Sequence, residues 1–242
     1  MAKKLALVIG PESSGTRILT ATLSQHPKIL GTPDASPHGD VLDEVWRQIA
    51  QGDVEKAREV FPNPADRECV LTRRSLPHAL NVGEPARYMD FSNLAGLHAL
   101  ARQLGLELIL LITTRSTAAN LASWTATRSS PGKSLDKARQ QYFASYLHIF
   151  SFLQETGVPF FLLSLEAFLL DRHEYVQSIF QMLGLDFHPL EITARADVNR
   201  SRYWWYFTQR EQGCWLPRPG SGHGVPHSRR RYRMPMQRTR PC

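Results

Sequence analysis

Residues 5–17 read Leu5-Ala6-Leu7-Val8-Ile9-Gly10-Pro11-Glu12-Ser13-Ser14-Gly15-Thr16-Arg17, and this stretch decides the predicted fold. Its first five residues form a continuous apolar run, which is typical of a parallel strand covered on both faces. A loop bounded by Gly10 and Gly15 follows, and the pattern after it predicts a helix over Thr16–Ser24. The stretch therefore predicts a buried strand, a glycine-bounded loop and a helix in direct succession.

A loop in this position is a ready anion site, because its backbone N–H groups and the helix dipole point into one concavity. The hydroxyls of Ser13, Ser14 and Thr16 add donors, and Arg17 adds a planar, permanently charged fork. The alternative is an ordinary tight turn between a strand and a helix. We favour anion binding and expect the ligand to be a phosphorylated nucleotide.

The loop differs from the phosphate loop of nucleotide triphosphatases, whose pattern is Gly-x4-Gly-Lys-Ser/Thr. Gly10 and Gly15 have the right spacing, but Thr16 and Arg17 replace the lysine and the magnesium-binding hydroxyl. The apolar segment Leu108–Ile112 also does not end in an aspartate that would hold magnesium. These departures disfavour a triphosphatase, and a degenerate ATP-dependent, kinase-like protein stays open as an alternative.

Strand-like and helix-like segments alternate along the rest of the chain. The further strands are expected at Cys69–Thr72, Leu108–Thr113 and Phe160–Leu163. The further helices are expected at Val41–Gln51, Val54–Val60, Phe91–Leu104, Ser116–Thr127, Leu135–Thr156 and Glu174–Leu183. This alternation predicts an α/β fold: a three-layer, P-loop-like domain with a mostly parallel central sheet flanked by helices.

The positive charge of the chain is concentrated at its C-terminal end. Lys and Arg number 29 against 22 Asp and Glu, and residues 217–242 hold seven arginines and no acid. That segment also has five prolines and three glycines, so it offers too little apolar surface to offset chain entropy. We therefore expect an α/β domain over residues 1–212 and an Arg/Pro/Gly-rich, disordered tail over residues 213–242.

Cysteine content and hydropathy indicate a cytoplasmic protein without a membrane anchor. The three cysteines are Cys69, Cys214 and Cys242, too few and too scattered for a disulfide framework or a zinc site. The apolar run after Met1–Lys4 is too short for a signal peptide, and no stretch reaches the roughly 18 apolar residues of a membrane span. No metal and no membrane partner are expected.

Three segments together resemble the PAPS-dependent sulfotransferases. Gly10–Leu23 looks like the family's 5′-phosphosulfate loop, and Gly15-Thr16-Arg17 is most similar to the heparan 3-O-sulfotransferase branch. Arg115 after a buried strand, with Ser123 eight residues on, resembles the pair that grips the 3′-phosphate of PAPS. Leu165–Leu185 resembles the late strand, acidic turn and Leu-Gly-Leu helix of the family.

The resemblance implies a transfer of the sulfuryl group of PAPS to a hydroxyl of a carbohydrate or small molecule, with PAPS as co-substrate. It implies no specific nucleic-acid partner. The residues that it assigns to PAPS binding are Ser13, Ser14, Gly15, Thr16, Arg17, Arg115 and Ser123.

The chain departs from the family at three places. Ser13 stands where the family has a Lys or Arg that bonds the bridging oxygen of the leaving phosphate, so Arg17 or another cation has to do that work. Leu165 replaces an expected tyrosine, and Arg210–Gly213 is the nearest candidate for the glycine-rich basic loop. A non-catalytic PAP or polyanion binder is therefore a further alternative.

The reaction needs one general base, and the sequence offers several candidates. The family's carboxylate location corresponds to the segment with Asp34, His38 and Asp40, while its histidine position falls on Ser75, close to His78. We rank His38 first, with Asp40 as its orienting partner and then His78, because a histidine pKa near neutrality suits the role. Arg17 completes the predicted catalytic set.

Overall fold

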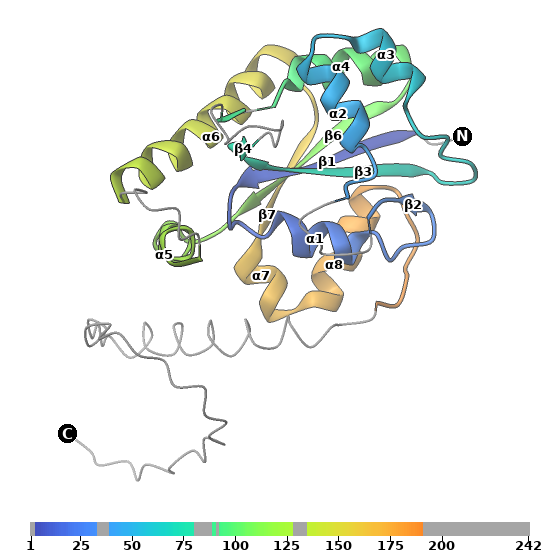
Figure 1. Ribbon diagram of the computed structural model, residues 1–242. Helices are drawn as coiled ribbons and strands as arrows, with labels where there is room; N and C mark the ends of the chain where they lie inside the picture. Colours follow the sequence, from blue (N-terminus) through green and yellow to red (C-terminus); the bar gives the residue numbers. More distant parts are fainter. Residues whose placement is uncertain (1–2, 33–38, 80–88, 91, 128–134, 191–242) are drawn as a thin grey trace, which may run out of the picture. The chain divides into compact units, whose positions relative to one another are not determined.

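The computed structural model describes residues 3–32, 39–79, 89–90, 92–127 and 135–190 of the chain. Its centre is a five-stranded sheet of order β2-β3-β1-β6-β7 in which all neighbouring strands are parallel (Figure 1). The strands are β1 (Lys4–Pro11), β2 (Ile29–Leu30), β3 (Cys69–Leu76), β6 (Glu107–Thr114) and β7 (Phe160–Ser164). The predicted α/β class with a mostly parallel central sheet is confirmed.

Helices cover both faces of the sheet, so that the domain has three layers (Figure 1). Residues of α2, α3, α4 and α6 share one apolar cluster with the sheet, and residues of α1, α7 and α8 share the other. The helices are α1 (Thr16–Leu23), α2 (Asp43–Ala50), α3 (Val54–Glu59), α4 (Leu94–Gln103), α5 (Thr117–Thr127), α6 (Leu135–Thr156), α7 (Leu165–Leu170) and α8 (Arg172–Met182).

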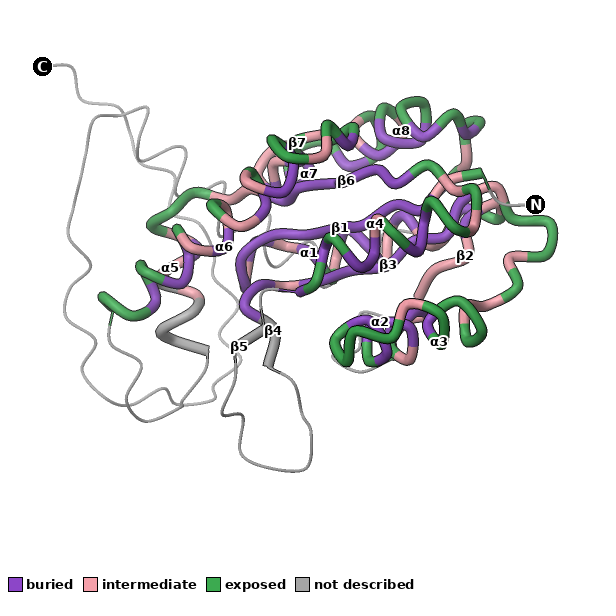
Figure 2. The backbone as a smooth tube through the Cα atoms, turned by 90° about the horizontal axis from the view of Figure 1, so that it is seen from above, coloured by how far each residue is buried: buried purple, intermediate pink, exposed green. Residues whose placement is uncertain are grey.

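The apolar run of β1 lies in the middle strand of the sheet and is buried (Figure 2). Leu5, Leu7 and Ile9 belong to the first cluster, while Ala6 and Val8 belong to the second, and all five are fully buried. Successive side chains of a strand point to opposite faces, so a strand between two helical layers needs apolar residues at every position. This explains why the run is continuous rather than alternating.

Two parts of the sequence prediction were wrong in extent or type. β3 continues to Leu76 instead of ending at Thr72, since Arg73 and Arg74 pair with Val8 and Ile9 of β1. Two arginines in succession gave no strand signal, and the pairing with β1 overrides their poor strand propensity.

The segment after β7 is helical from its first residue rather than a strand and an acidic turn. The Ser164 hydroxyl accepts a hydrogen bond from Ala167 N (3.2 Å) and caps α7, which begins at Leu165. Two short strands, β4 (His78–Ala79) and β5 (Met89–Asp90), form a separate antiparallel pair. Within the part of the chain that the structure describes, no helix has the length and apolar character needed to span a membrane.

Candidate functional site

The candidate site lies where the parallel strands end. The carboxyl ends of β1, β3, β6 and β7 meet at one edge of the sheet, and binding sites of such sheets form there. The loop after β1, residues 12–15, leads into α1 at this edge. We call residues 12–15 together with Thr16, the first residue of α1, the β1 loop.

Both glycines that bound the β1 loop are required by packing. A Cβ on Gly10 would lie 2.2 Å from Thr113 Oγ1 and 2.7 Å from Thr113 O, so only glycine permits this approach of β1 to β6. Gly15 has a φ of 101°, and a Cβ there would lie 2.7 Å from Leu165 Cδ1. The glycine spacing alone is thus explained without a ligand, and the case for an anion site rests on the other residues.

Ser13 and Arg115 connect the β1 loop to the end of β6. Ser13 has a left-handed backbone with a φ of 66°, which costs an L-residue roughly 1–2 kcal/mol. Arg115 Nη1 donates a hydrogen bond to Ser13 O at 2.8 Å. The two positions that the sequence assigned to opposite ends of PAPS are therefore adjacent in space, and Arg115 holds the strained residue in place.

Two pairs of hydroxyl groups connect the β1 loop to the neighbouring strands. Ser14 Oγ lies 2.6 Å from Thr113 Oγ1, which itself donates to Ile9 O at 3.3 Å, so Ser14 is the donor of the pair. Thr16 Oγ1 lies 2.5 Å from Ser75 Oγ of β3. Since the Ser14 proton goes to Thr113, Ser14 shapes the loop, and its predicted contact with a nucleotide stays a prediction.

The N-terminus of α1 follows directly on this loop. The first helical hydrogen bond runs from Leu19 N to Gly15 O, so the N–H groups of Thr16, Arg17 and Ile18 precede it. No acidic residue lies in the first turn of α1. Within the loop, the N–H groups of Glu12 and Ser14 donate to Leu76 O and Pro11 O. The side chain of Arg17 is exposed.

The backbone around Arg115 is anchored from two sides. Glu166 Oε1 accepts from Ser116 N at 2.8 Å, and Tyr146 Oη donates to Thr113 O at 3.0 Å. Burial raises the pKa of the Tyr146 phenol above its ordinary value, so it stays a neutral donor. Ser123 is half-buried and lies in α5, the helix that follows Arg115. These contacts hold the arginine backbone at the sheet edge.

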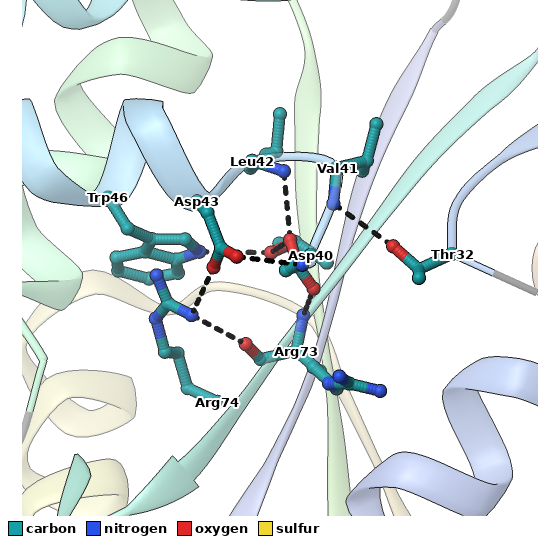
Figure 3. Close-up of polar contacts among 9 residues, drawn as sticks. Thr32, Asp40, Val41, Leu42, Asp43, Trp46, Arg73 and Arg74 are labelled. Carbon is teal, nitrogen blue, oxygen red and sulfur yellow. Dashed lines mark hydrogen bonds and ion pairs between the residues drawn. The ribbon is translucent and has the colours of Figure 1, made fainter. Parts of the chain in front are cut away.

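Beside β3, a buried carboxylate organises a second polar group of residues (Figure 3). Asp40 Oδ1 accepts from Leu42 N (2.9 Å) and Thr72 Oγ1 (2.7 Å), and Asp40 Oδ2 accepts from Arg73 N (3.0 Å). Burial raises the pKa of Asp40 above its ordinary value, while the hydrogen bond from Thr72 opposes that shift. Asp40 therefore connects the start of α2 to the middle of β3 through hydrogen bonds.

Arg74 and Trp46 complete this group. The Arg74 guanidinium carbon lies 4.5 Å from the centre of the Trp46 ring, and Arg74 Nη1 lies 3.4 Å from Asp43 Oδ1. Trp46 Nε1 donates to Thr72 Oγ1 at 2.9 Å. We call Asp40, Asp43, Trp46, Thr72, Arg73 and Arg74 the β3 cluster. Arg73 points to the other side of β3 from Arg74 (Figure 3).

The structure brings together some of the predicted site residues. Ser13, Ser14, Gly15, Thr16 and Arg115 lie at one edge of the sheet, joined through the bonds above. The described contacts of the Asp40 carboxylate are those with Leu42 N, Thr72 Oγ1 and Arg73 N.

Other predicted residues lie outside what the structure describes. His38, Asp34 and Arg210–Gly213 fall outside the described residues, as does the domain boundary predicted after residue 212. The backbone of His78 belongs to β4, but its side chain is not described. The roles of all these residues stay predictions.

Sequence reasoning missed several polar residues at the sheet edge. Thr113 and Ser75 contact the β1 loop, Glu166 caps the backbone after Arg115, and Arg73 and Arg74 are both 7% exposed. The available signal for Ser75, Thr113 and Glu166 was their position at or just after the end of a strand next to β1 or β6. Arg73 and Arg74 lie inside β3 and gave no such signal. Among the described residues, no group of three or more His, Cys, Asp or Glu side chains could hold a metal ion.

No protein-family model and no curated protein matches the chain. Among solved structures, it is similar to a sulfotransferase from Alicyclobacillus acidocaldarius, with 12% identity, a TM-score of 0.46, and coverage of 88% of this chain and 96% of that one. The sulfotransferase domain from the curacin biosynthetic pathway gives 14% identity and a TM-score of 0.49, covering 77% of this chain and 76% of that domain. A retinol dehydratase in a complex with retinol and PAP gives 12% identity and a TM-score of 0.36, covering 86% of this chain and 65% of that one.

These likenesses are too distant to carry an argument about chemistry. All three TM-scores lie below 0.5 and the identities do not exceed 14%. The fold class stands on the strand order and the parallel pairing observed in this chain. The finer resemblance to the heparan 3-O branch stays a prediction.

Proposed function

We propose that the chain is a sulfotransferase that moves the sulfuryl group of PAPS to a hydroxyl of a carbohydrate or small-molecule acceptor. The observation that carries the proposal is the hydrogen bond from Arg115 Nη1 to Ser13 O at 2.8 Å. It supports a single site in which the β1 loop takes the 5′-phosphosulfate and Arg115, with Ser123, takes the 3′-phosphate. A nucleotide with phosphates at both ends needs both anchors, whereas a triphosphate needs the lysine and hydroxyl that Thr16 and Arg17 replace.

In this proposal the β1 loop binds by backbone donors. The N–H groups at the start of α1 and the positive end of its dipole face the 5′-phosphosulfate. The Ser14–Thr113 and Thr16–Ser75 pairs hold the loop in shape before the ligand arrives. Because the donors are preorganised, they stabilise charge that develops during transfer without reorganising.

The transfer itself is an in-line displacement at sulfur. The acceptor oxygen forms a bond to sulfur while the bond from sulfur to the bridging phosphate oxygen breaks, and PAP leaves with the electron pair. The acceptor proton passes to the general base, for which we propose His38, and Arg17 offsets charge on the leaving phosphate. We propose Asp40 as the orienting partner of His38, and the described bonds of its carboxylate are those from Leu42 N, Thr72 Oγ1 and Arg73 N.

A thermal-shift panel of PAP, PAPS, ADP and ATP tests the proposal. PAP at micromolar concentration is expected to raise the Tm of the wild-type chain, and Arg115→Ala is expected to abolish the shift. Absence of a shift with PAP contradicts the proposal. Binding of ATP that requires magnesium and is lost in EDTA would favour the kinase-like alternative.

Release of PAP from PAPS in the presence of acceptors separates an enzyme from a binding protein. We expect release to depend on a hydroxyl-bearing carbohydrate or small molecule and to fall in His38→Ala. A chain that binds PAP tightly but releases none from PAPS with a broad acceptor panel is a non-catalytic binder. Deletion of residues 217–242 is expected to leave PAP binding unchanged.

A further inference from the structure

One side of the strand β7 has no strand partner among the described residues. β7 pairs with β6, and the order β2-β3-β1-β6-β7 places it at the edge of the sheet. The hydrogen bond from Leu110 N to Pro159 O (3.0 Å) fixes which residues of β7 face β6. N–H and C=O groups of alternate residues point to opposite sides of a strand, so those of Phe161 face β6 and those of Phe160 and Leu162 face the free side.

β7 lacks the features that normally protect the edge of a sheet. Soluble proteins keep edge strands short or place charges, prolines or bulges on them. The strand at the opposite edge, β2, follows this rule because it has only two residues. β7 has five residues, Phe160–Ser164, with no charged residue and no proline, and its register with β6 is unbroken. The contrast between the two edges favours a strand partner at β7.

The side chains of β7 point to two different environments. Phe161 and Leu163 pack against the apolar cluster shared with α1, α7 and α8. Phe160 and Leu162 alternate with them and therefore point to the layer of α6, where they are 44% and 56% exposed. A large apolar side chain that is half in water is stabilised when a partner covers it. Open backbone groups and exposed apolar side chains thus coincide at the same two residues.

A second copy of the chain is complementary to this edge. Ser164 caps α7, so its C=O group belongs to that helix, and the open groups are those of Phe160 and Leu162. In antiparallel pairing centred on Phe161, Phe160 of each copy lies opposite Leu162 of the other. Each of these pairs exchanges N–H···O bonds in both directions and forms an apolar cross-strand contact. The pairing is symmetric and buries no charge of the strand.

The apolar surface available on this side of the sheet has the size that a stable dimer needs. α6 lies in the layer to which Phe160 and Leu162 point, and its exposed residues Phe143, Leu147 and Phe150 form one stripe at spacings of four and three residues. Burial of the exposed parts of these five side chains would remove about 500 Å² of apolar surface from each copy. Because interfaces are about 60% apolar, this corresponds to about 800 Å² per copy, the usual size of a specific interface.

We propose that the chain forms a two-fold symmetric dimer in which the β7 strands of two copies pair antiparallel, with Phe161 at the symmetry axis. The two five-stranded sheets then form one continuous sheet. Two-fold pairing of this kind keeps the α6 layers of both copies on the same side, where the stripe on α6 completes the interface. The proposal concerns assembly and does not depend on the chemistry proposed above.

Sedimentation equilibrium of the full chain tests the dimer. At about 10 μM, the wild type is expected to have twice the 27.5 kDa mass of the chain. Leu162→Lys brings a charge from each copy close to the symmetry axis and is expected to raise the Kd of the dimer by at least about tenfold.

Phe187→Lys is the matched control for Leu162→Lys. Phe187 is also exposed, but it follows Asp186, whose carboxylate accepts from Lys28 next to β2 at the opposite edge of the sheet. This variant is expected to leave the Kd of the dimer within about twofold of wild type. A wild-type chain that stays monomeric up to about 100 μM, or a dimer that both variants weaken equally, overturns the proposal.

Cysteine cross-linking tests the register and does not depend on how a lysine affects folding. Phe161 and its copy form a non-hydrogen-bonded pair with Cα atoms about 4.5 Å apart, within the reach of a disulfide. With Cys214 and Cys242 replaced by serine, Phe161→Cys is expected to give a covalent dimer on mild oxidation, whereas Phe187→Cys is not. The remaining Cys69 is buried. Equal cross-linking of both variants, or of neither, overturns the proposal.

Discussion

The β1 loop and the β3 cluster lie at neighbouring strands of one sheet, yet they use polar residues in opposite ways. In the β3 cluster, the Asp40 carboxylate accepts three hydrogen bonds and Asp43 offsets the charge of Arg74. At the β1 loop, hydroxyls pair with hydroxyls and the arginine binds a neutral carbonyl. The described bonds of the β3 cluster thus join charged groups within the fold, whereas those at the β1 loop join hydroxyls to one another and an arginine to a carbonyl oxygen.

Gly10→Ala is expected to have the largest effect of the variants that test this difference between the two regions. The new Cβ would meet Thr113 Oγ1 at 2.2 Å and Thr113 O at 2.7 Å, so β1 and β6 must separate. We expect the free energy of unfolding to fall by about 3 kcal/mol and PAP binding to be lost. Gly52→Ala is the control: Gly52 has a φ of 81° and open space around it, so only about 1 kcal/mol is expected. Equal losses in denaturant melts would show that crowding at Gly10 is unimportant.

Asp40→Asn tests the β3 cluster, where we expect a loss of stability without a loss of PAP affinity. The asparagine amide has one oxygen acceptor where the carboxylate has two, and its NH2 group is itself a donor. At least one of the three donors, Leu42 N, Thr72 Oγ1 or Arg73 N, therefore loses its acceptor. Unfolding in urea should show a loss of about 2 kcal/mol. The affinity for PAP should change less than threefold, unlike in Arg115→Ala. A tenfold loss of PAP affinity in a folded Asp40→Asn protein would mean that the β3 cluster also contributes to ligand binding, and would contradict the distinction between the two regions.

The titration of Asp40 predicts a pH dependence of stability. Its native pKa is raised from the ordinary value of 3.8, so the native state holds the proton more tightly than the unfolded state does. The contribution of this titration is therefore greatest below pH 3.8 and declines as the pH rises through the native pKa. In urea melts at several pH values, the wild-type stability minus that of Asp40→Asn should decline across this window and then level off. A difference that increases with pH would mean that the native pKa is lowered.

Ser14→Ala gives the smallest expected effect. It removes one buried hydrogen bond, to Thr113 Oγ1, and should cost about 1 kcal/mol of unfolding free energy. Since the Ser14 proton is directed to Thr113, PAP binding should weaken only through the loop shape, by less than about fivefold. Thr113→Val, which removes the partner hydroxyl, is the matched variant and should give a similar result. A far larger loss of PAP affinity in Ser14→Ala would mean that Ser14 touches the nucleotide.

The sequence predicts those parts of the fold that local patterns determine. The strand, loop and helix of residues 5–23 are marked by a continuous apolar run and two glycines, and the 22-residue helix α6 by its helical pattern; both predictions are confirmed. The two-residue strand β2 has no such pattern, because its pairing with β3 depends on residues about 40 positions apart. The extension of β3 through Arg73 and Arg74 has the same non-local origin.

The residues of the candidate site also fall into those that local sequence patterns predict and those that depend on non-local contacts. Gly15 and Arg115 could be selected from their positions after strands, since the edge of a parallel sheet follows from strand order alone. That Arg115 reaches Ser13, and that Asp40 is buried with three donors, could not be predicted. Such contacts join residues some 30 to 100 positions apart, and they depend on side-chain directions that only the packed structure fixes.

The central position of β1 has a consequence for synthesis of the chain. β1 occupies residues 4–11, but its two edges pair with β3 at residues 69–76 and with β6 at residues 107–114. More than a hundred residues must therefore leave the ribosome before both edges of this apolar strand are covered. Until then, the nascent chain exposes an unpaired hydrophobic strand, which makes its first half a substrate for chaperones and a risk for aggregation.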